Sequence, residues 1–578
     1  MKELLIGNAA VARGAYEAGV GIVSSYPGTP STEITEVMAT YKEVNVEWAP
    51  NEKVAAEVAI GASMGGARAM SCMKHVGMNV MADPLFTVSY IGVNGGLVFC
   101  VADDPGMHSS QNEQDSRHYA KASKVLMVEP SDSKECKEYT KLAFELSEKY
   151  DVPVIVRLST RVAHSQGLVE IEDRIDYKLK DYNKNIAKNV MMPANAIKKH
   201  VVVEERAKIL QDLANTNLLN KIENNNSKIG IITAGISYMY SKEALGNKVD
   251  YLKLGMVYPL PTNLIIDFAK KHKKIYVIEE LDPFIEEHVK SLGIEVIGKD
   301  EFTLLGEYNP SMIKKVVLNE KPNDFYQIEE QIPARPPVMC PGCPHRGTFY
   351  VLKKLGLTVS GDIGCYTLGA VKPLESVDST ICMGASVSAA FGMSKARGAE
   401  FNKKLVSVIG DSTFIHSGIT GLIDIVYNKG ANTIIILDNS ITGMTGHQQN
   451  PTTGKTIRLE DTIPVNLVDL AHSVGVKRVV VADPFDIKNF EEVVKKETEA
   501  LEPSVIIAQR PCALLKNVKY SGYCKINSNC KKCKQCMKLG CPAISLVNDS
   551  IVIDQTQCNG CGLCVNVCPF KAIEKIEG

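Results

Sequence analysis

Short apolar runs alternate with longer amphipathic segments along most of the chain, and this pattern predicts α/β domains. The apolar runs are rich in β-branched residues, and helical spacing follows them. In the first third of the chain we expect strands at Gly21–Ser25, Val98–Val101 and Val154–Leu158. Runs of this kind are typical of parallel strands that helices cover on both faces, as in doubly wound sheets.

A chain of 578 residues is too long to fold around a single hydrophobic core, so several domains are expected. The stretch 181–228 is polar and reads as helical, and a second set of strands follows it, including Lys274–Ile278. The proline-rich stretch Ile332–Pro337 predicts a stiff linker. The predicted domains are residues 1–192, 193–330, 331–518 and 519–578.

The third predicted domain contains the buried strands Leu405–Ile409, Thr433–Leu437 and Val505–Ala508. The fourth is short and rich in cysteine. The expected fold class is therefore α/β, with several doubly wound parallel-sheet domains and a small α+β domain at the C-terminus.

Composition narrows the class of protein. Hydrophobic residues make up 45% of the chain, and the net charge of −1 gives no general case for binding nucleic acid or membranes. The N-terminus lacks a signal-peptide core, and no apolar run reaches membrane-spanning length, so we expect a cytoplasmic protein. Nine of the 17 cysteines are scattered, as reduced thiols would be.

Charge is balanced overall but not locally, because residues 503–548 contain no Asp or Glu. Such a basic stretch is often only a solvated face. Here it could also offset the charge of metal-bound thiolates or steer an acidic electron carrier. Its cationic residues are Arg510, Lys516, Lys519, Lys525, Lys531, Lys532, Lys534 and Lys538.

The tail holds eight cysteines in two runs, and each run ends in Cys-Pro. The first run is Cys530, Cys533, Cys536 and Cys541, and the second is Cys558, Cys561, Cys564 and Cys568. Two-residue gaps let one loop present three thiolates to a [4Fe–4S] cluster, and the fourth ligand comes from the other run. We therefore assign Cys568 to the first cluster and Cys541 to the second.

Zinc and disulfides are the alternatives, but doubled triplets fit a four-ligand zinc site poorly. The tail resembles two-cluster bacterial ferredoxins, although the four-residue gap before Cys541 is one longer than usual. Cys524 lies outside both runs, and we expect it to be dispensable. The clusters indicate electron transfer in a reducing, anaerobic setting.

A candidate phosphate site lies in the third domain. Gly410, Asp411 and Ser412 follow one apolar strand, and Asn439 follows the next. In a doubly wound sheet both would project beyond the carboxyl ends of the strands, where phosphate ligands bind. A carboxylate, an amide oxygen and a loop carbonyl suit Mg²⁺. Two ordinary strand-to-helix turns are the alternative.

This arrangement resembles the thiamine diphosphate motif GDG…NN, with Ser412 and Asp438 as departures from it. The resemblance implies that Asp411, Asn439 and the carbonyl of Ile441 bind Mg²⁺, which bridges the diphosphate. Thiamine enzymes also need a glutamate against the aminopyrimidine ring. The segment from Asn51 resembles the pyrimidine-binding segment of these enzymes and implies Glu52 for this role, with Glu57 as the competitor.

Other segments resemble 2-oxoacid:ferredoxin oxidoreductases. In the segment from Tyr26 to Ser31, Thr29 takes the place of a threonine that meets the substrate carboxylate; a plain helix N-cap is the alternative. We interpret the loop from Cys340 to His345 as an active-site loop, not a metal site. Further candidates around the cofactor are Gly361, Asp362, Gly364, Cys365, Cys340, Cys343, His345 and Gly384, and His416 is a candidate catalytic residue.

The order of these motifs, over essentially the whole chain, resembles the large subunits of indolepyruvate:ferredoxin oxidoreductases. Segments starting at Lys74, Met107 and Cys340 are similar to that branch. The resemblance implies arylpyruvate substrates, coenzyme A, ferredoxin as acceptor and a smaller beta subunit. It also implies thiamine diphosphate, Mg²⁺ and two [4Fe–4S] clusters as cofactors.

Three other functions stay open at this stage. Another 2-oxoacid:ferredoxin oxidoreductase would share all of these motifs. A non-oxidative thiamine diphosphate decarboxylase would need no clusters. A non-catalytic electron-transfer subunit would need neither Glu52 nor ligands for Mg²⁺.

Overall fold

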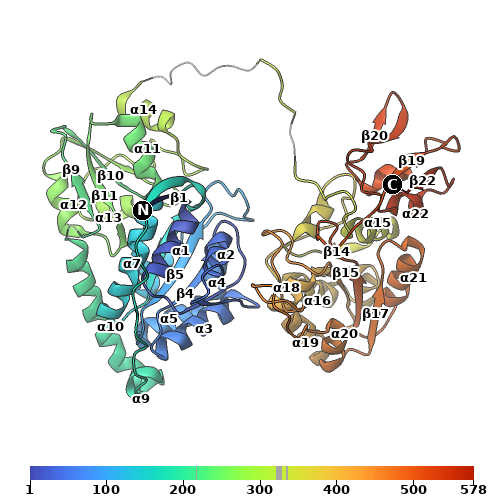
Figure 1. Cartoon of the computed structure of the whole chain (residues 1–578), viewed down its shortest axis with the longest axis horizontal. Coiled ribbons are helices and arrows are strands. Elements are labelled where there is room, and N and C mark those ends of the chain that lie inside the picture. Colours follow the sequence, from blue (N-terminus) through green and yellow to red (C-terminus); the bar gives the residue numbers. More distant parts are fainter. Residues whose placement is uncertain (217, 321–328, 334–335, 578) are drawn as a thin grey trace. The chain divides into compact units, whose positions relative to one another are not determined.

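The computed structural model describes residues 1–216, 218–320, 329–333 and 336–577. The chain divides into two compact units, Met1–Glu329 and Glu330–Gly578 (Figure 1). Residues 334–335 of the expected linker Ile332–Pro337 lie outside the described residues. None of the described helices is long and apolar enough to span a membrane.

A seven-stranded sheet forms the centre of the first unit. Its strands, in spatial order, are β12 (Met256–Tyr258), β6 (Leu126–Val128), β7 (Val154–Ser159), β5 (Leu97–Asp103), β4 (Ala69–Lys74), β2 (Ile22–Ser25) and β3 (Asn45–Trp48). All neighbours pair in parallel except β12 with β6. Every residue of β4, β5 and β7 is buried, as expected for strands covered on both faces.

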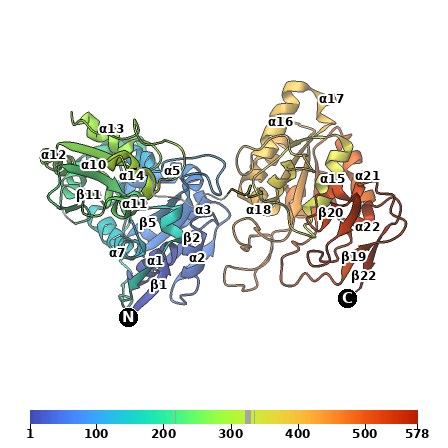
Figure 2. The same cartoon turned by 90° about the horizontal axis from the view of Figure 1, so that it is seen from above.

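Helices connect these strands and cover the sheet (Figures 1 and 2). They are α1 (Gly7–Glu17), α2 (Thr32–Met38), α3 (Glu52–Met64), α4 (His75–Val80), α5 (Ala82–Ile91), α6 (Arg117–Ser123), α7 (Ser133–Tyr150) and α8 (Thr160–His164). A small antiparallel ribbon pairs β1 (Lys2–Ile6) with β8 (Gln166–Glu170).

A second sheet in the same unit has four strands. In spatial order they are β13 (Lys274–Ile278), β10 (Ile229–Ala234), β11 (Asp250–Leu254) and β9 (Lys221–Glu223). The helices around it are α9 (Ile186–Asn189), α10 (Pro193–Ala214), α11 (Gly235–Leu245), α12 (Thr262–Ala269), α13 (Phe284–Ser291) and α14 (Pro310–Leu318).

Two sequence expectations need adjustment here. The stretch 181–228 is helical only in α9 and α10, and its last part forms the strand β9. The sequence pattern did not predict β9, because a three-residue edge strand is too short to show a period. The segments 1–192 and 193–330 also share structure, since β12 extends the edge of the first sheet.

The second unit is built on a five-stranded parallel sheet. Its strands, in spatial order, are β14 (Thr358–Ser360), β15 (Leu405–Gly410), β16 (Thr433–Asp438), β18 (Ser504–Gln509) and β17 (Arg478–Ala482). The helices are α15 (His345–Leu355), α16 (Ala385–Arg397), α17 (Ala399–Asn402), α18 (Asp411–Thr413), α19 (Ile419–Tyr427), α20 (Leu467–Ser473) and α21 (Ile487–Thr498), with a 3₁₀ turn η1 (Cys365–Ala370) and a π-helix η2 (Phe414–Gly418).

The cysteine-rich tail belongs to this second unit and lies beside α15 in both views (Figures 1 and 2). It pairs β19 (Tyr523–Ile526) with β22 (Ile573–Ile576) and β20 (Ile544–Val547) with β21 (Ser550–Ile553), and adds η3 (Gln535–Leu539) and α22 (Leu563–Val567). Its apolar residues share one buried cluster with side chains of the sheet domain, such as Phe349 and Phe485. The tail is therefore packed on the sheet domain.

Candidate functional site

The eight cysteines of the two tail runs gather around two pockets. One pocket is lined by Cys530, Cys533, Cys536 and Cys568. The last of these comes from the second run, so the structure brings together the four residues that spacing assigns to one cluster. The backbone N–H of Ala572 donates a hydrogen bond to Cys568 Sγ at 3.3 Å. Such bonds to sulfur tune the reduction potential of a cluster.

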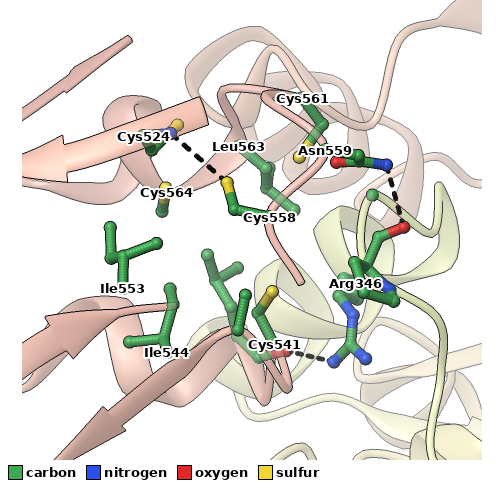
Figure 3. Close-up of a pocket in the computed structure, with 14 residues that line it drawn as sticks. Arg346, Cys524, Cys541, Ile544, Ile553, Cys558, Asn559, Cys561, Leu563 and Cys564 are labelled. Atoms are coloured by element: carbon green, nitrogen blue, oxygen red, sulfur yellow. Dashed lines mark hydrogen bonds between the residues drawn. The ribbon is translucent and has the colours of Figure 1, made fainter. Parts of the chain in front are cut away.

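The other pocket is lined by Cys541, Cys558, Cys561 and Cys564, again in the expected combination, and also by Cys524. Figure 3 shows these five side chains arranged around a common space. The backbone N–H of Cys524 donates a hydrogen bond to Cys558 Sγ at 3.3 Å. Cys524 lies next to a proposed cluster because β19 passes the pocket, which its place in the sequence does not indicate.

Each pocket is lined by four cysteines of the two runs, and four thiolates are the ligand set of one [4Fe–4S] cluster. The cysteines are also free thiols, which argues against the disulfide alternative.

The loop that starts at Cys340 borders the second pocket, which Pro341 and Gly342 help to line. The side-chain amide of Asn559 donates to the carbonyl of Pro341 at 3.1 Å. A Cβ at Gly342 would lie 2.3 Å from Asn559 Nδ2, and the φ of +72° also favours glycine. Arg346 donates to the carbonyl of Leu539 at 2.8 Å (Figure 3). The loop is therefore fixed against the cluster-binding tail.

Four further thiols of the sheet domain, those of Cys340, Cys343, Cys365 and Cys512, belong to a group in which the charge of one raises the pKa of another. Burial, and then the charges of Cys512 and Cys340, raise the pKa of Cys365 to about 11. Burial, and to a lesser extent the charges of Cys365 and Cys340, raise the pKa of Cys343 to about 12. The sequence predicts an active-site loop here and not a metal site, because no second cysteine pair follows Cys343. The other two thiols, those of Cys365 and Cys512, belong to single cysteines far from this loop in the sequence.

Asp411 lies where the phosphate motif predicts, directly after β15, and its side chain is buried. Burial, and then the charge of Asp438, raise the pKa of Asp411 to about 7. Its carboxylate accepts hydrogen bonds from the N–H of Ser412 at 2.8 Å and the hydroxyl of Thr452 at 3.3 Å. A buried carboxylate that faces a second carboxylate is costly without a cation, so the site fits Mg²⁺.

Asn439 follows β16, the strand next to β15, so the two predicted ligands share one sheet edge. Its Oδ1 accepts the N–H of Ile441 at 3.3 Å, and its Nδ2 lies 3.5 Å from His345 Nε2. Burial lowers the pKa of His345 to about 4, so its ring is neutral. The carbonyl of Asn439 accepts the N–H of Cys512 at 2.9 Å. This contact connects the predicted Mg²⁺ site with the four-thiol group.

The glycine-rich loops meet through Asp362, which is fully buried. Its Oδ1 accepts the N–H of Gly384 and its Oδ2 that of Ser386, both at 2.9 Å. Asp362 therefore shapes the loop at the start of α16. Gly364 and Gly410 must be small for a separate reason: a Cβ at either position would clash with the ring of Tyr366.

His416 is buried in the π-helix η2, one turn after Asp411. Its Nδ1 lies 2.8 Å from the hydroxyl of Ser417, which in turn donates to the carbonyl of Met383. π-Helical turns are frequent at functional sites. The geometry places His416 close to the phosphate motif and gives its ring a fixed orientation.

Glu52 opens α3 in the first unit and is buried, 4% exposed. Asn51 caps the helix by accepting the N–H of Val54 at 2.9 Å. The carboxylate of Glu52 lies against α4, because a Cβ at Gly77 would come within 2.7 Å of Oε1. The competing residue Glu57 is exposed and forms an ion pair with Lys53 on the same helix face. Its surroundings are those of a surface acid.

Thr29 lies in the loop after β2 and is half-buried. Its carbonyl accepts the hydroxyl of Ser109 at 3.2 Å. Ser31 occupies the N-cap position of α2, but its hydroxyl donates to the carbonyl of Gly28 at 2.8 Å. Ser31 and not Thr29 stands at the N-cap position, so the N-cap alternative for Thr29 is wrong.

Three parts of the chain match known families. Residues 13–223 match the pyruvate flavodoxin/ferredoxin oxidoreductase thiamine diphosphate-binding family. Residues 362–508 match the C-terminal TPP-binding domain of thiamine pyrophosphate enzymes, and residues 551–574 match the 4Fe–4S binding domain.

The chain is also similar to curated relatives over nearly its whole length. It is 41% identical to the indolepyruvate oxidoreductase subunit IorA of Archaeoglobus fulgidus, over 99% of this chain and 97% of the relative. It is 40% identical to the Pyrococcus horikoshii subunit of the same name, over 100% and 97%. A solved 2-oxoglutarate:ferredoxin oxidoreductase from Magnetococcus marinus aligns at 20% identity over 55% of this chain and 65% of that chain, with a TM-score of 0.49.

Proposed function

Because the chain belongs to the family of indolepyruvate oxidoreductase subunits IorA, we propose that it oxidatively decarboxylates arylpyruvates to aryl-acetyl-CoA. It is a thiamine diphosphate-dependent oxidoreductase with an iron–sulfur domain, of the 2-oxoacid:ferredoxin oxidoreductase family. The proposed substrates are indolepyruvate, phenylpyruvate and 4-hydroxyphenylpyruvate. Coenzyme A would accept the acyl group and ferredoxin the electrons, and a smaller beta subunit would complete the complex.

One observation supports the proposal: the predicted Mg²⁺ ligands and the two cysteine-lined pockets belong to the same compact unit. Asn439 bonds to the backbone of Cys512, and the loop from Cys340 contacts the second tail pocket through Asn559. A non-oxidative decarboxylase would have no use for the cysteine-lined pockets, and an electron-transfer subunit would have no use for the phosphate motif.

The residues at the phosphate end fit thiamine diphosphate, which when bound accepts the electron pair left by carbon dioxide. We assign Asp411, Asn439 and the carbonyl of Ile441 to Mg²⁺, which would neutralise both the diphosphate and the buried carboxylate of Asp411. In the first unit, the carboxylate of Glu52 would hold the proton on the aminopyrimidine ring, and Thr29 would donate to the substrate carboxylate. His416, with its fixed ring, would move a proton near the phosphate motif.

We propose two [4Fe–4S] clusters in the tail, with the ligand sets that line the two pockets. The four-thiol group of Cys340, Cys343, Cys365 and Cys512 has the ligands for a further cluster, and its place beside Asn439 suits the first electron acceptor. Lys531 and Lys534 line the first tail pocket, which supports docking of acidic ferredoxin there.

Iron content tests these assignments. We expect about twelve irons per chain, four for each proposed cluster. Cys568→Ser should damage only the cluster of the first pocket, and Cys340→Ser only the cluster of the sheet domain, as resolved by electron paramagnetic resonance of the reduced protein. The matched control is Cys524→Ser, which should keep every cluster. Loss of a cluster in that control would mean that Cys524 is a ligand, and a content of about eight irons would remove the sheet-domain cluster.

A substrate series tests the proposed reaction on the complex of this chain with its partner subunit. Reduction of ferredoxin should depend on coenzyme A and be fastest with the three arylpyruvates, and pyruvate and 2-oxoglutarate should be poor. A single methylene in an apolar pocket contributes about 1–3 kcal/mol, so a whole ring should discriminate more strongly. A preference for pyruvate or 2-oxoglutarate would refute the substrate assignment and leave the cofactor chemistry unchanged.

A further inference from the structure

The large sheet of the first unit has a topological switch point between β2 and β4. From β2 the chain continues to β3 on one side and then to β4 on the other. Open α/β sheets bind ligands outside the carboxyl ends of the strands that flank such a point. The two strands also separate there: β2 pairs with β4 only at Ile22 and Val23, although it pairs with β3 over four residues.

Lys74 is the last residue of β4, so it lies at this opening, and its side chain is nine-tenths buried. The loop after β2 passes over its stem, since a Cβ at Gly28 would lie 3.3 Å from Lys74 Cγ. Ser109 connects the two strands: its carbonyl accepts from Lys74 Nζ at 3.0 Å, and its hydroxyl donates to the carbonyl of Thr29 at 3.2 Å. Lys74 and Thr29 therefore border the same space.

The charge of Lys74 has no direct partner within the part of the first unit that the structure describes. Its one hydrogen bond goes to a neutral carbonyl, and Asp104 and Glu52 act on it only through their fields. Asp104 is already occupied, because Thr160, Ser110 and the N–H of Ser109 donate to its carboxylate at 2.7–2.8 Å. Burial lowers the pKa of Lys74 to about 8, against the raising effect of the two carboxylates.

The next residue, His75, is 1% exposed, and neither ring nitrogen has a hydrogen-bond partner among the described residues. Burial, and then the charge of Lys74, lower its pKa to about 4, so the ring is neutral. At the place where the topology predicts a ligand, the buried ammonium of Lys74 thus has only a neutral carbonyl as its partner, and the buried ring of His75 beside it has no hydrogen-bond partner among the described residues. Buried polar groups without partners are costly, so such a pair indicates a polar ligand.

We propose that the ammonium group of Lys74 binds the carboxylate of the 2-oxoacid substrate at this switch point. A carboxylate there would form a buried ion pair with Lys74 and lie within reach of Thr29. The inference rests on the proposed function, in which every candidate substrate is a 2-oxoacid. It assigns a substrate-binding residue to a segment, Lys74–Gly77, that resembles one branch of the family.

The carboxylate is also the group that leaves as carbon dioxide, and this decides which kinetic constant should change. An ion pair that is as strong in the ground state as in the transition state strengthens substrate binding without accelerating the bond-breaking step. Removal of Lys74 should therefore raise KM much more than it lowers kcat. A purely structural lysine would instead lower stability or cofactor content and leave KM unchanged.

The test compares Lys74→Met with Lys53→Met in the intact complex. Methionine keeps the length of the buried stem, and Lys53 is an exposed lysine on the neighbouring helix α3. KM for phenylpyruvate should rise at least about 30-fold in Lys74→Met, as expected for one partner of a buried charge pair. Lys53→Met should keep the wild-type KM, and Lys74→Arg should recover part of the loss. Bound thiamine and the cluster spectrum should match the wild type in all variants.

A second measurement separates charge recognition from misfolding. Wild-type complex should be inhibited more strongly by 3-phenylpropionate than by 3-phenylpropionamide, which has the same shape but no charge, and Lys74→Met should lose this difference. An unchanged KM or an unchanged preference for the acid would overturn the proposal. If the wild type prefers another 2-oxoacid, the arylpyruvate assignment fails, yet Lys74→Met should still raise KM for that acid, because the carboxylate is common to all.

Discussion

Asp411→Ala should leave the protein without bound thiamine diphosphate and therefore inactive, while the clusters remain. The carboxylate of Asp411 is the one anionic ligand assigned to Mg²⁺, and without it the diphosphate would lose its bridge to the protein. The side chain is buried at the end of β15, so water cannot easily supply an equivalent ligand. Thiamine analysis of the purified protein, together with its visible spectrum, measures both parts of this result.

The matched control is Asp424→Ala, which removes an exposed aspartate of α19 in the same domain. Its carboxylate accepts a hydrogen bond from the side chain of Asn428 on the same exposed helix face, so cofactor content should not change. If Asp411→Ala retains its full complement of thiamine diphosphate, the phosphate motif has been assigned to the wrong residue.

Glu52→Gln should reduce turnover by roughly 10²–10⁴-fold, the range typical of a lost acid–base group. Glutamine has the same size and keeps the helix cap made by Asn51, so the fold and much of the cofactor binding should survive. The amide cannot hold the aminopyrimidine proton as a carboxylate does. Exchange of the thiazolium proton with solvent deuterium, followed by NMR after rapid quenching, reports this step directly.

Glu57→Gln serves as the control for Glu52→Gln. Glu57 is exposed and paired with Lys53, so its loss should change exchange and turnover little. Near-normal proton exchange in Glu52→Gln would show that the pyrimidine partner is another residue. A loss confined to Glu57→Gln would reverse the assignment within α3.

The tail shows how far a spaced motif can lead. Two-residue gaps let one tight loop present three thiolates, and in two-cluster ferredoxins, which the tail resembles, the fourth ligand comes from the other run, which predicts the pairing of Cys568 with the first run. The phosphate motif could also be predicted from local patterns. Asp411 and Asn439 each follow a strongly apolar run, and adjacent parallel strands bring the ends of such runs together.

The four-thiol group shows where spacing fails. Cys365 and Cys512 are separated by nearly the whole sheet domain, and each is a single cysteine without a local partner. Cys365 begins η1 after β14 and Cys512 follows β18, so only the folded sheet brings the charge of Cys512 close enough to raise the pKa of Cys365. The position of Cys524 against the second pocket has the same kind of cause, since β19 joins β22 at the other end of the tail.

The sequence by itself determined the features that depend on near neighbours: the alternation of strands and helices, the spacing of the cysteine runs and the polar residues at the strand ends. Only the tertiary structure decided which distant residues share a space. Sheet order joined Lys74 to Thr29 through Ser109, and it left a buried lysine without a carboxylate partner. The physical reason is that burial and pairing of charges depend on contacts between segments far apart in the chain, which no local pattern encodes.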